Sequence, residues 1–222
     1  MKTTDLKHDS AMKHVTGQSV YVNDITANRQ LVGRVVYSTQ AHARLSLLDT
    51  NAASKLDGIV AILTHKDIPG ENQMGPVVHD EPCLAVDEVT FIGQAIALVA
   101  AETEEAAIKA EKLIRIEYEE LETILTLDDA IEKNNLIAPP RIIECGNVAE
   151  TLKSAPHVVS GVLETGAQEH WYLETQSALA IPGEGKEMLI HASSQNPAET
   201  QSIVAEVIGI PKNEVEVEVR RM

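Results

Sequence analysis

The chain has 222 residues, of which 44% are hydrophobic, and a net charge of −16. This length allows one or two domains, and the scattered lysines and arginines exclude the basic face that a nucleic-acid-binding protein needs. The longest apolar run, "AIALVAA", is far shorter than the roughly 20 residues that cross a bilayer, and the first residues lack the apolar core of a signal peptide, so we expect a cytoplasmic protein without a membrane partner.

Strand signals dominate the first half of the chain. Runs of aliphatic and β-branched residues predict strands over 31–38 and 93–101 and a buried strand within 57–70. Alternating polarity predicts a half-buried strand over 114–121. The stretch 68–82 has three prolines and two glycines without periodicity, which predicts a long loop.

Helix signals in this half begin at Thr103. Its hydroxyl is placed to cap a helix over 104–114, and the acidic first turn suits the positive end of the helix dipole. Ala106, Ala107, Ala110 and Leu113 form one apolar stripe at helical spacing. A short helix is predicted over 127–134. Residues 138–147 contain Pro-Pro and Gly, which predicts a connector and a domain boundary.

Beyond this boundary, strands are predicted over 157–166 and 188–193. The best-marked helix covers 196–209, where Asn196 caps, Pro197 takes the first helical position and Gly209 follows the end. Its predicted buried stripe consists of Ile203, Val204, Val207 and Ile208. The strictly alternating "EVEVEV" over 214–219 predicts a strand that turns inward its three valines, Val215, Val217 and Val219.

Motifs of the common catalytic classes are absent. The sequence has neither a glycine-rich phosphate loop nor a nucleophile elbow. Cys83 and Cys145 lie far apart and the histidines do not pair at ligand spacing, so a zinc or iron–sulfur site is not expected. The concentrated chemistry of "GAQEHWYLET" (166–175) fits either a functional site or a strand edge with packed aromatic residues and solvated polar groups, and spacing does not decide between them.

Seven segments that occur in order point to a family. They are "HDSAMKHVTGQSVYVND" (8–24), "AHARL" (41–45), "LTHKDIPGENQMG" (63–75), "IGQAIALVAAET" (92–103), "YEEL" (118–121), "GAQEHWYLET" (166–175) and "SSQNPAETQSIVAEVIGIPKNEVEVEVRRM" (193–222). Together they resemble the N-terminal part of the molybdenum-binding subunit in the xanthine dehydrogenase/aldehyde oxidase family of molybdenum hydroxylases, most closely its bacterial xanthine dehydrogenases.

The resemblance implies an α+β fold of two parts. Residues 14–124 resemble the family's α/β hammerhead domain, and residues 145–222 resemble the truncated start of its molybdopterin-binding domain. The domain boundary predicted near 138–147 agrees with this division.

The resemblance also implies a role for Gln168. In the family, the Gln of a GGQEH-type motif donates a hydrogen bond to an oxygen ligand of molybdenum. A glutamine amide suits this role because it donates without carrying a charge. The chain departs from the family at Ala167, where Gly is usual, and Ala would perturb the site if the position required a positive φ. No residue is assigned as catalytic or as a direct metal ligand.

The family resemblance implies that this chain is one portion of an enzyme that hydroxylates purines or aldehydes. The family's glycine-rich segment and its catalytic Glu do not occur in the sequence, so we expect inactivity of the chain alone. The implied cofactor is molybdopterin, held together with the remainder of the molybdenum-binding domain. The implied partners are subunits carrying a 2Fe-2S cluster and FAD.

Two alternatives and one expectation about assembly accompany this interpretation. The chain could instead be a non-catalytic module on which iron–sulfur and flavin subunits assemble. An unrelated small enzyme that uses the region of His170 is the third hypothesis. Because "EVEVEV" would form an open strand edge, self-association through residues 157–222 is expected, and light scattering over a wide concentration range would test it.

Overall fold

The computed structural model describes residues 8–75, 77–171 and 176–220. Its α-helices are α1 (Ala11–Val15), α2 (Glu104–Leu113), α3 (Leu127–Glu132), α4 (Val148–Ser154) and α5 (Pro197–Ile208). Its strands are β1 (Val32–Tyr37), β2 (Ala43–Asp49), β3 (Ile59–Leu63), β4 (Glu88–Val89), β5 (Ala95–Ala101), β6 (Arg115–Glu120), β7 (Ala178–Pro182), β8 (Met188–Ala192) and β9 (Val215–Glu218). Single 3-10 turns are η1 (Val22–Asp24), η2 (Ala53–Lys55), η3 (His65–Asp67) and η4 (Lys212–Glu214).

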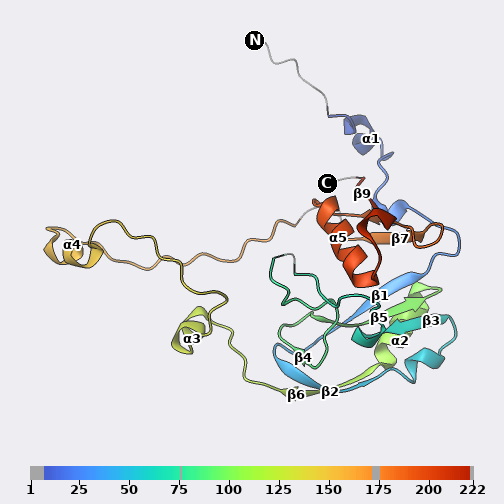
Figure 1. Cartoon of the computed structure of the whole chain (residues 1–222), viewed down its shortest axis with the longest axis horizontal. Coiled ribbons are helices and arrows are strands. Elements are labelled where there is room, and N and C mark those ends of the chain that lie inside the picture. Colours follow the sequence, from blue (N-terminus) through green and yellow to red (C-terminus); the bar gives the residue numbers. More distant parts are fainter. Residues whose placement is uncertain (1–7, 76, 172–175, 221–222) are drawn as a thin grey trace, which may run out of the picture. The chain divides into compact units, whose positions relative to one another are not determined.

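Two three-stranded antiparallel sheets form the N-terminal part, with strand orders β1-β5-β3 and β4-β2-β6 (Figure 1). The first sheet buries Val36 and Val99 against the small Ala107 and Ala110 of α2. A second cluster forms around Val89 of β4, in the second sheet, and Ile96 of β5, in the first. Because Leu48 and Ile116 pack against both clusters, the two sheets share one aliphatic core.

Helix α2 follows its predicted cap. The Thr103 hydroxyl accepts a hydrogen bond from the Ala106 amide at 3.2 Å, and Ala107 and Ala110 are fully buried. Leu113, the last residue of the predicted apolar stripe, is 45% exposed. The buried position at the helix end belongs to Ile114, where the chain turns into β6.

Residues 123–171 form a region of a different kind. Their helices α3 and α4 start at Thr126 and Asn147, whose side chains accept hydrogen bonds from Asp129 and Glu150 amides. The strand predicted over 157–166 is wrong, because these residues adopt no regular secondary structure and are exposed throughout. A strand needs a partner for its backbone groups, and the structure pairs no described strand with this stretch.

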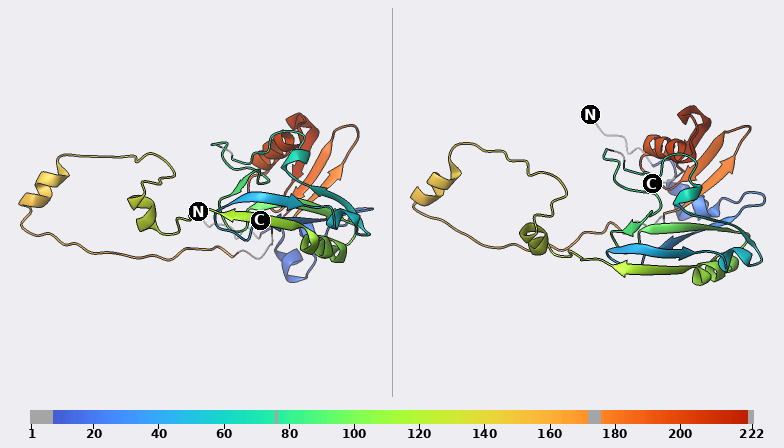
Figure 2. Two further views of the ribbon diagram at one scale, coloured as in Figure 1. Left: turned by 90° about the horizontal axis from the view of Figure 1, so that it is seen from below. Right: turned by 60° about the horizontal axis from the view of Figure 1, so that its bottom comes forward.

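A third sheet, with the order β7-β8-β9, carries α5 on one face (Figure 2). Asn196 caps α5 by accepting from the Glu199 amide at 3.1 Å, and Gly209 ends it with φ 68°, as predicted. The predicted stripe is only half-buried, and Ala205 is the α5 residue that the cluster encloses. Ala205 belongs to one buried cluster with Ile190 and Ala192 of β8 and Val215 of β9.

Strand β9 confirms the strand predicted from "EVEVEV". It runs parallel to β8 and lies at the edge of its sheet among the described residues, with Val215 buried and Val217 half-buried. Two antiparallel sheets sharing a core with α2, and a third sheet with α5 on one face, confirm the predicted α+β class. Self-association through residues 157–222 stays a prediction.

Candidate functional site

Gln168 lies in an exposed stretch of the chain that forms no pocket by itself. All described residues from 156 to 171 are exposed, and the stretch 166–171 has no regular secondary structure. The predicted site residue therefore presents its amide on an open segment. The remaining residues of the motif, 172–175, lie outside the described residues.

The backbone next to Gln168 shows whether the position of Ala167 requires a positive φ. Among the described residues, positive φ outside glycine occurs at Arg29, Asn134 and Trp171 and not at Ala167. Alanine is therefore compatible with the backbone conformation here. The turn that follows is local, since the Trp171 amide donates to the Glu169 carboxylate at 3.3 Å while the Trp171 side chain stays 89% exposed.

The residues present have the donor chemistry that a molybdenum cofactor needs, but they do not form a pocket that would enclose it. An exposed, neutral amide at Gln168 can donate to a metal-bound oxygen without adding charge. A cofactor pocket, however, buries most of its ligand's surface, and residues 156–171 provide only an edge. Within the described part of the chain, no three His, Cys, Asp or Glu side chains gather in a group that could hold a metal ion.

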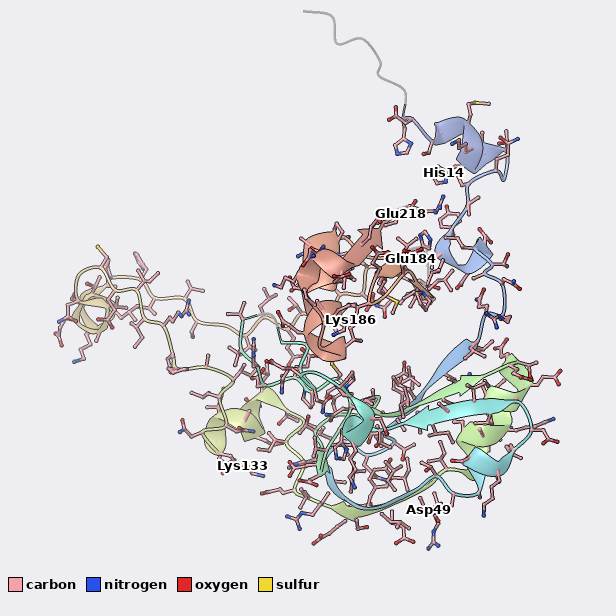
Figure 3. The ribbon with its side chains drawn as sticks, turned by 45° about the vertical axis from the view of Figure 1, so that its right-hand side comes forward. His14, Asp49, Lys133, Glu184, Lys186 and Glu218 are labelled. Carbon is pink, nitrogen blue, oxygen red and sulfur yellow. The ribbon has the colours of Figure 1, made fainter. Side chains whose placement is uncertain are left out.

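Two histidines have structural partners. His42 places one ring nitrogen 2.5 Å from the Glu122 carbonyl and the other 2.8 Å from the Glu88 carboxylate, and the first of these bonds, followed by the second, raises the pKa of His42. His191 is 4% exposed, and its Nδ1 lies 3.1 Å from the carboxylate of Glu218, which Figure 3 labels near the end of β9. The His191 contact joins the neighbouring strands β8 and β9, whereas His42 lies just before β2 and contacts Glu88 of β4 and Glu122 just after β6.

Cys83 likewise has the environment of a structural thiol. It is half-buried, and burial raises its pKa, which lowers the thiolate fraction and hence its reactivity. It lines a small cavity of about 230 Å³ together with Tyr37 and Phe91. No catalytic role follows from this arrangement.

Comparison with known families covers nearly the whole chain. Residues 16–122 match the family described as "Aldehyde oxidase and xanthine dehydrogenase, a/b hammerhead domain". Residues 129–222 match the "Molybdopterin cofactor-binding domain" family. The chain belongs to the xanthine dehydrogenase/aldehyde oxidase family. Its sheets β1-β5-β3 and β4-β2-β6 are thus those of a hammerhead domain, and Gln168 lies in the region that matches the cofactor-binding domain.

Curated members of the family align along almost the full chain. The xanthine dehydrogenase of Dictyostelium discoideum is 41% identical over 220 residues, which are 99% of this chain and 16% of that protein. Aldehyde oxidase 2 of Rattus norvegicus is 38% identical over 220 residues, 98% of this chain and 16% of its own length. The chain therefore spans about one sixth of these relatives.

Solved structures show the same fold. Quinoline 2-oxidoreductase from Pseudomonas putida 86 superposes with a TM-score of 0.85 at 24% identity, over 99% of this chain and 30% of that one. The similarity extends from the hammerhead sheets to β9. The arrangement is thus a family fold and not a peculiarity of this sequence.

Sequence reasoning missed the segment that connects the hammerhead domain to α5. The motif "LTHKDIPGENQMG" by itself indicates only the family resemblance and a long loop. In the structure, Gly70 and Glu71 contact the end of α5, and Asn72 contacts Leu84. The sequence signal that could have indicated this contact is Gly70, which follows Pro69 and comes shortly before Asn72, whose side chain can bond backbone groups.

Helices long and apolar enough to span a membrane do not occur among the described residues. The short helices of residues 123–171 and the amphipathic α2 and α5 account for all described α-helices apart from α1. The predicted cytoplasmic location stays a prediction.

Proposed function

We propose that this chain is the N-terminal portion of a xanthine dehydrogenase-like molybdenum hydroxylase subunit that oxidises purines. The observation that carries the proposal is identity of 41–42% with several xanthine dehydrogenases over 97–99% of the chain, with Gln168 inside the matched cofactor-binding region. The domain bounds proposed are 14–124 for the hammerhead and 145–222 for the start of the cofactor-binding domain.

The molybdenum cofactor supplies the hydroxylation chemistry when it is bound. Gln168, on the exposed stretch 156–171, would hold the cofactor through a neutral N–H donor, which carries no charge and has no proton to exchange. Glu169 holds the local turn by accepting from the Trp171 amide. None of these groups is placed to act as the general base, so we infer that the chain is inactive without the residues that complete the site.

The proposed partners follow from the electron balance. Hydroxylation of a purine carbon removes two electrons from the substrate, so a redox carrier must accept them. We propose that subunits or domains carrying a 2Fe-2S cluster and FAD do so, and that the remainder of the molybdenum-binding domain covers residues 123–171. The large aliphatic side chains exposed in that region, among them Ile137, Ile143 and Val159, support a covering partner.

A second candidate function is favoured by the hammerhead itself. Its two sheets share a closed aliphatic core, whereas residues 123–171 have none. A domain that is complete without the cofactor region could serve as a platform on which iron–sulfur and flavin subunits assemble. Binding of those subunits to residues 8–122 with no molybdenum requirement would favour this function over the first.

Reconstitution tests the proposal. The chain is co-expressed with the remaining molybdopterin-binding region of a relative, and molybdenum content and purine oxidation are measured. We expect Gln168→Ala to lower kcat/KM by roughly 10–100-fold, the cost typical of losing a group that orients a metal ligand. Glu164→Ala, four residues earlier on the same exposed stretch, is the matched control and should leave both quantities unchanged.

Two results would contradict the proposal. One is tight molybdenum binding and purine oxidation by the chain alone, because the open segment would then suffice. The other is full activity of the reconstituted Gln168→Ala variant, which would remove Gln168 from the site.

A further inference from the structure

The end of helix α5 is completed by a segment far away in the sequence. An α-helix leaves its last carbonyl groups without helical partners. At α5, the Ala205 carbonyl accepts from the Ile210 amide, as in an ordinary glycine-ended helix. The next two carbonyls are satisfied from elsewhere. The Glu71 amide donates to the Glu206 carbonyl, and the Gly70 amide donates to the Val207 carbonyl, each at 2.9 Å.

The approach of the two backbones depends on Gly70. A Cβ atom at this position would lie 2.7 Å from the Gly209 amide nitrogen and 2.8 Å from the Val207 carbonyl oxygen, with the Glu206 carbonyl closer still. These neighbours are backbone atoms, which cannot turn away as a flexible side chain can. Any residue other than glycine must therefore push the loop off α5.

Another residue of the same loop, Asn72, bonds to the hammerhead core. The Asn72 side chain donates to the Leu84 carbonyl at 2.7 Å and accepts from the Leu84 amide at 2.9 Å. Leu84 is only 2% exposed, so its backbone is a rigid anchor. Three consecutive residues thus bond to the buried body of the hammerhead on one side and to the end of α5 on the other.

A second attachment lies on the third sheet. The Ser177 hydroxyl donates to the Asn23 side-chain oxygen at 2.6 Å, and Val22 of η1, which packs near β7, is 3% exposed. The third sheet and α5 are therefore held by the N-terminal part of the chain at two separate places. Their own buried cluster is small, with four buried residues.

We propose that residues 70–72 form an interdomain latch, in which the hammerhead domain supplies the C-terminal cap of α5 and thereby stabilises the β7–β9 sheet of the molybdopterin-binding domain. Gly70 permits the contact and Asn72 fixes the loop that makes it. The latch also borders a cleft of about 430 Å³ between the loop and α5, lined by residues including Gln73, Glu206 and Lys212. The latch holds whichever reaction the complete enzyme performs.

Hydrogen exchange on the full chain tests the latch. We expect Gly70→Ala to speed amide exchange in α5 and β9 by about tenfold or more, while exchange in β5 and α2 of the hammerhead stays within about twofold of the parent. Gly33→Ala is the matched control, because Gly33 lies on β1 and a Cβ atom added there would meet no atom within 4 Å, so it should leave α5 unchanged.

Asn72→Ala provides an independent variant that leaves residue 70 intact, so the test remains decisive if Gly70→Ala does not fold. It should raise exchange in α5 and β9 in the same pattern, to a smaller extent. Unchanged exchange of α5 in Asn72→Ala would overturn the latch. Equal acceleration of β5 and α5 would also overturn it, since the loop would then support the whole fold and not the contact between domains.

Discussion

Residues 20–122 and residues 123–171 are both rich in aliphatic side chains, yet they bury them very differently. The first region encloses its aliphatic residues in two clusters joined by Leu48 and Ile116. In the second region no described residue is buried, and Ile137, Ile143 and Val159 are almost fully exposed. Apolar composition alone therefore does not make a core, because a core also needs strands that pair and a helix that covers them.

The difference fits the two family matches. Residues 20–122 lie within the hammerhead match, and residues 129–171 lie within the match to the cofactor-binding domain. The single tryptophan, Trp171, lies in the open region and is 89% exposed, so its fluorescence will not report unfolding of the hammerhead. Circular dichroism is the appropriate probe for the core.

The largest contrast between the regions is expected in proteolysis. Trypsin should cut after Lys133, Arg141 and Lys153 on the order of a thousandfold faster than after Arg34, because cleavage follows local opening and residues 123–171 have no core to open. Lys133 follows α3 and is labelled in Figure 3. Mass spectrometry of timed digests measures the order of cuts. First cleavage in β1 or α2 would reverse the comparison.

Core substitutions should separate the regions next. Ile96 is fully buried, and Ile96→Ala should lower the free energy of unfolding by about 2–5 kcal/mol. Val159 is 98% exposed, and Val159→Ala should change it by less than about 0.5 kcal/mol. Urea titration followed by circular dichroism measures both. A comparable loss in both variants would show that residues 123–171 share the hammerhead core in solution.

Helix caps extend the contrast to a smaller scale. Thr103 caps α2, which packs on the core, so Thr103→Ala should cost about 1 kcal/mol of global stability. Asn147 makes the same kind of cap on α4, which has no buried residue, so Asn147→Ala should leave the urea midpoint unchanged. A global effect of Asn147→Ala would mean that α4 is packed.

The smallest effect concerns pH. Hydrogen bonds to the Glu122 carbonyl and to Glu88 raise the pKa of His42 above its usual 6.5. The stabilisation of the folded state by protonated His42 is therefore fully present below about pH 6.5. It is lost as the pH rises through the higher pKa that His42 has in the folded protein. His42→Ala should lower the free energy of unfolding by less than about 1 kcal/mol at acidic pH and should leave it almost unchanged at alkaline pH. The exposed His157→Ala serves as control, and a pH-independent effect of His42→Ala would refute the assignment.

Much of the local structure followed from the sequence. The caps Thr103 and Asn196, the terminating Gly209 and the alternation of "EVEVEV" each specify an element through contacts within a few residues. The strand predicted over 157–166 failed for the opposite reason, since its β-branched pattern requires a partner strand that the described structure does not supply. Strand β2, with seven residues, and strand β7, with five, were not predicted.

Some features of the candidate site were likewise predictable from the sequence, and others required the structure. The order of residues was enough to establish the family motifs and an aliphatic core poor in aromatic residues, and to predict a neutral donor at Gln168. Folding in three dimensions was needed to show that Gln168 lies on an open segment and that Gly70 meets the end of α5, with Asn72 tying that loop to Leu84. The two kinds of information differ in range, because caps and alternation act between neighbours in the chain, whereas burial and backbone pairing depend on segments that only folding brings together.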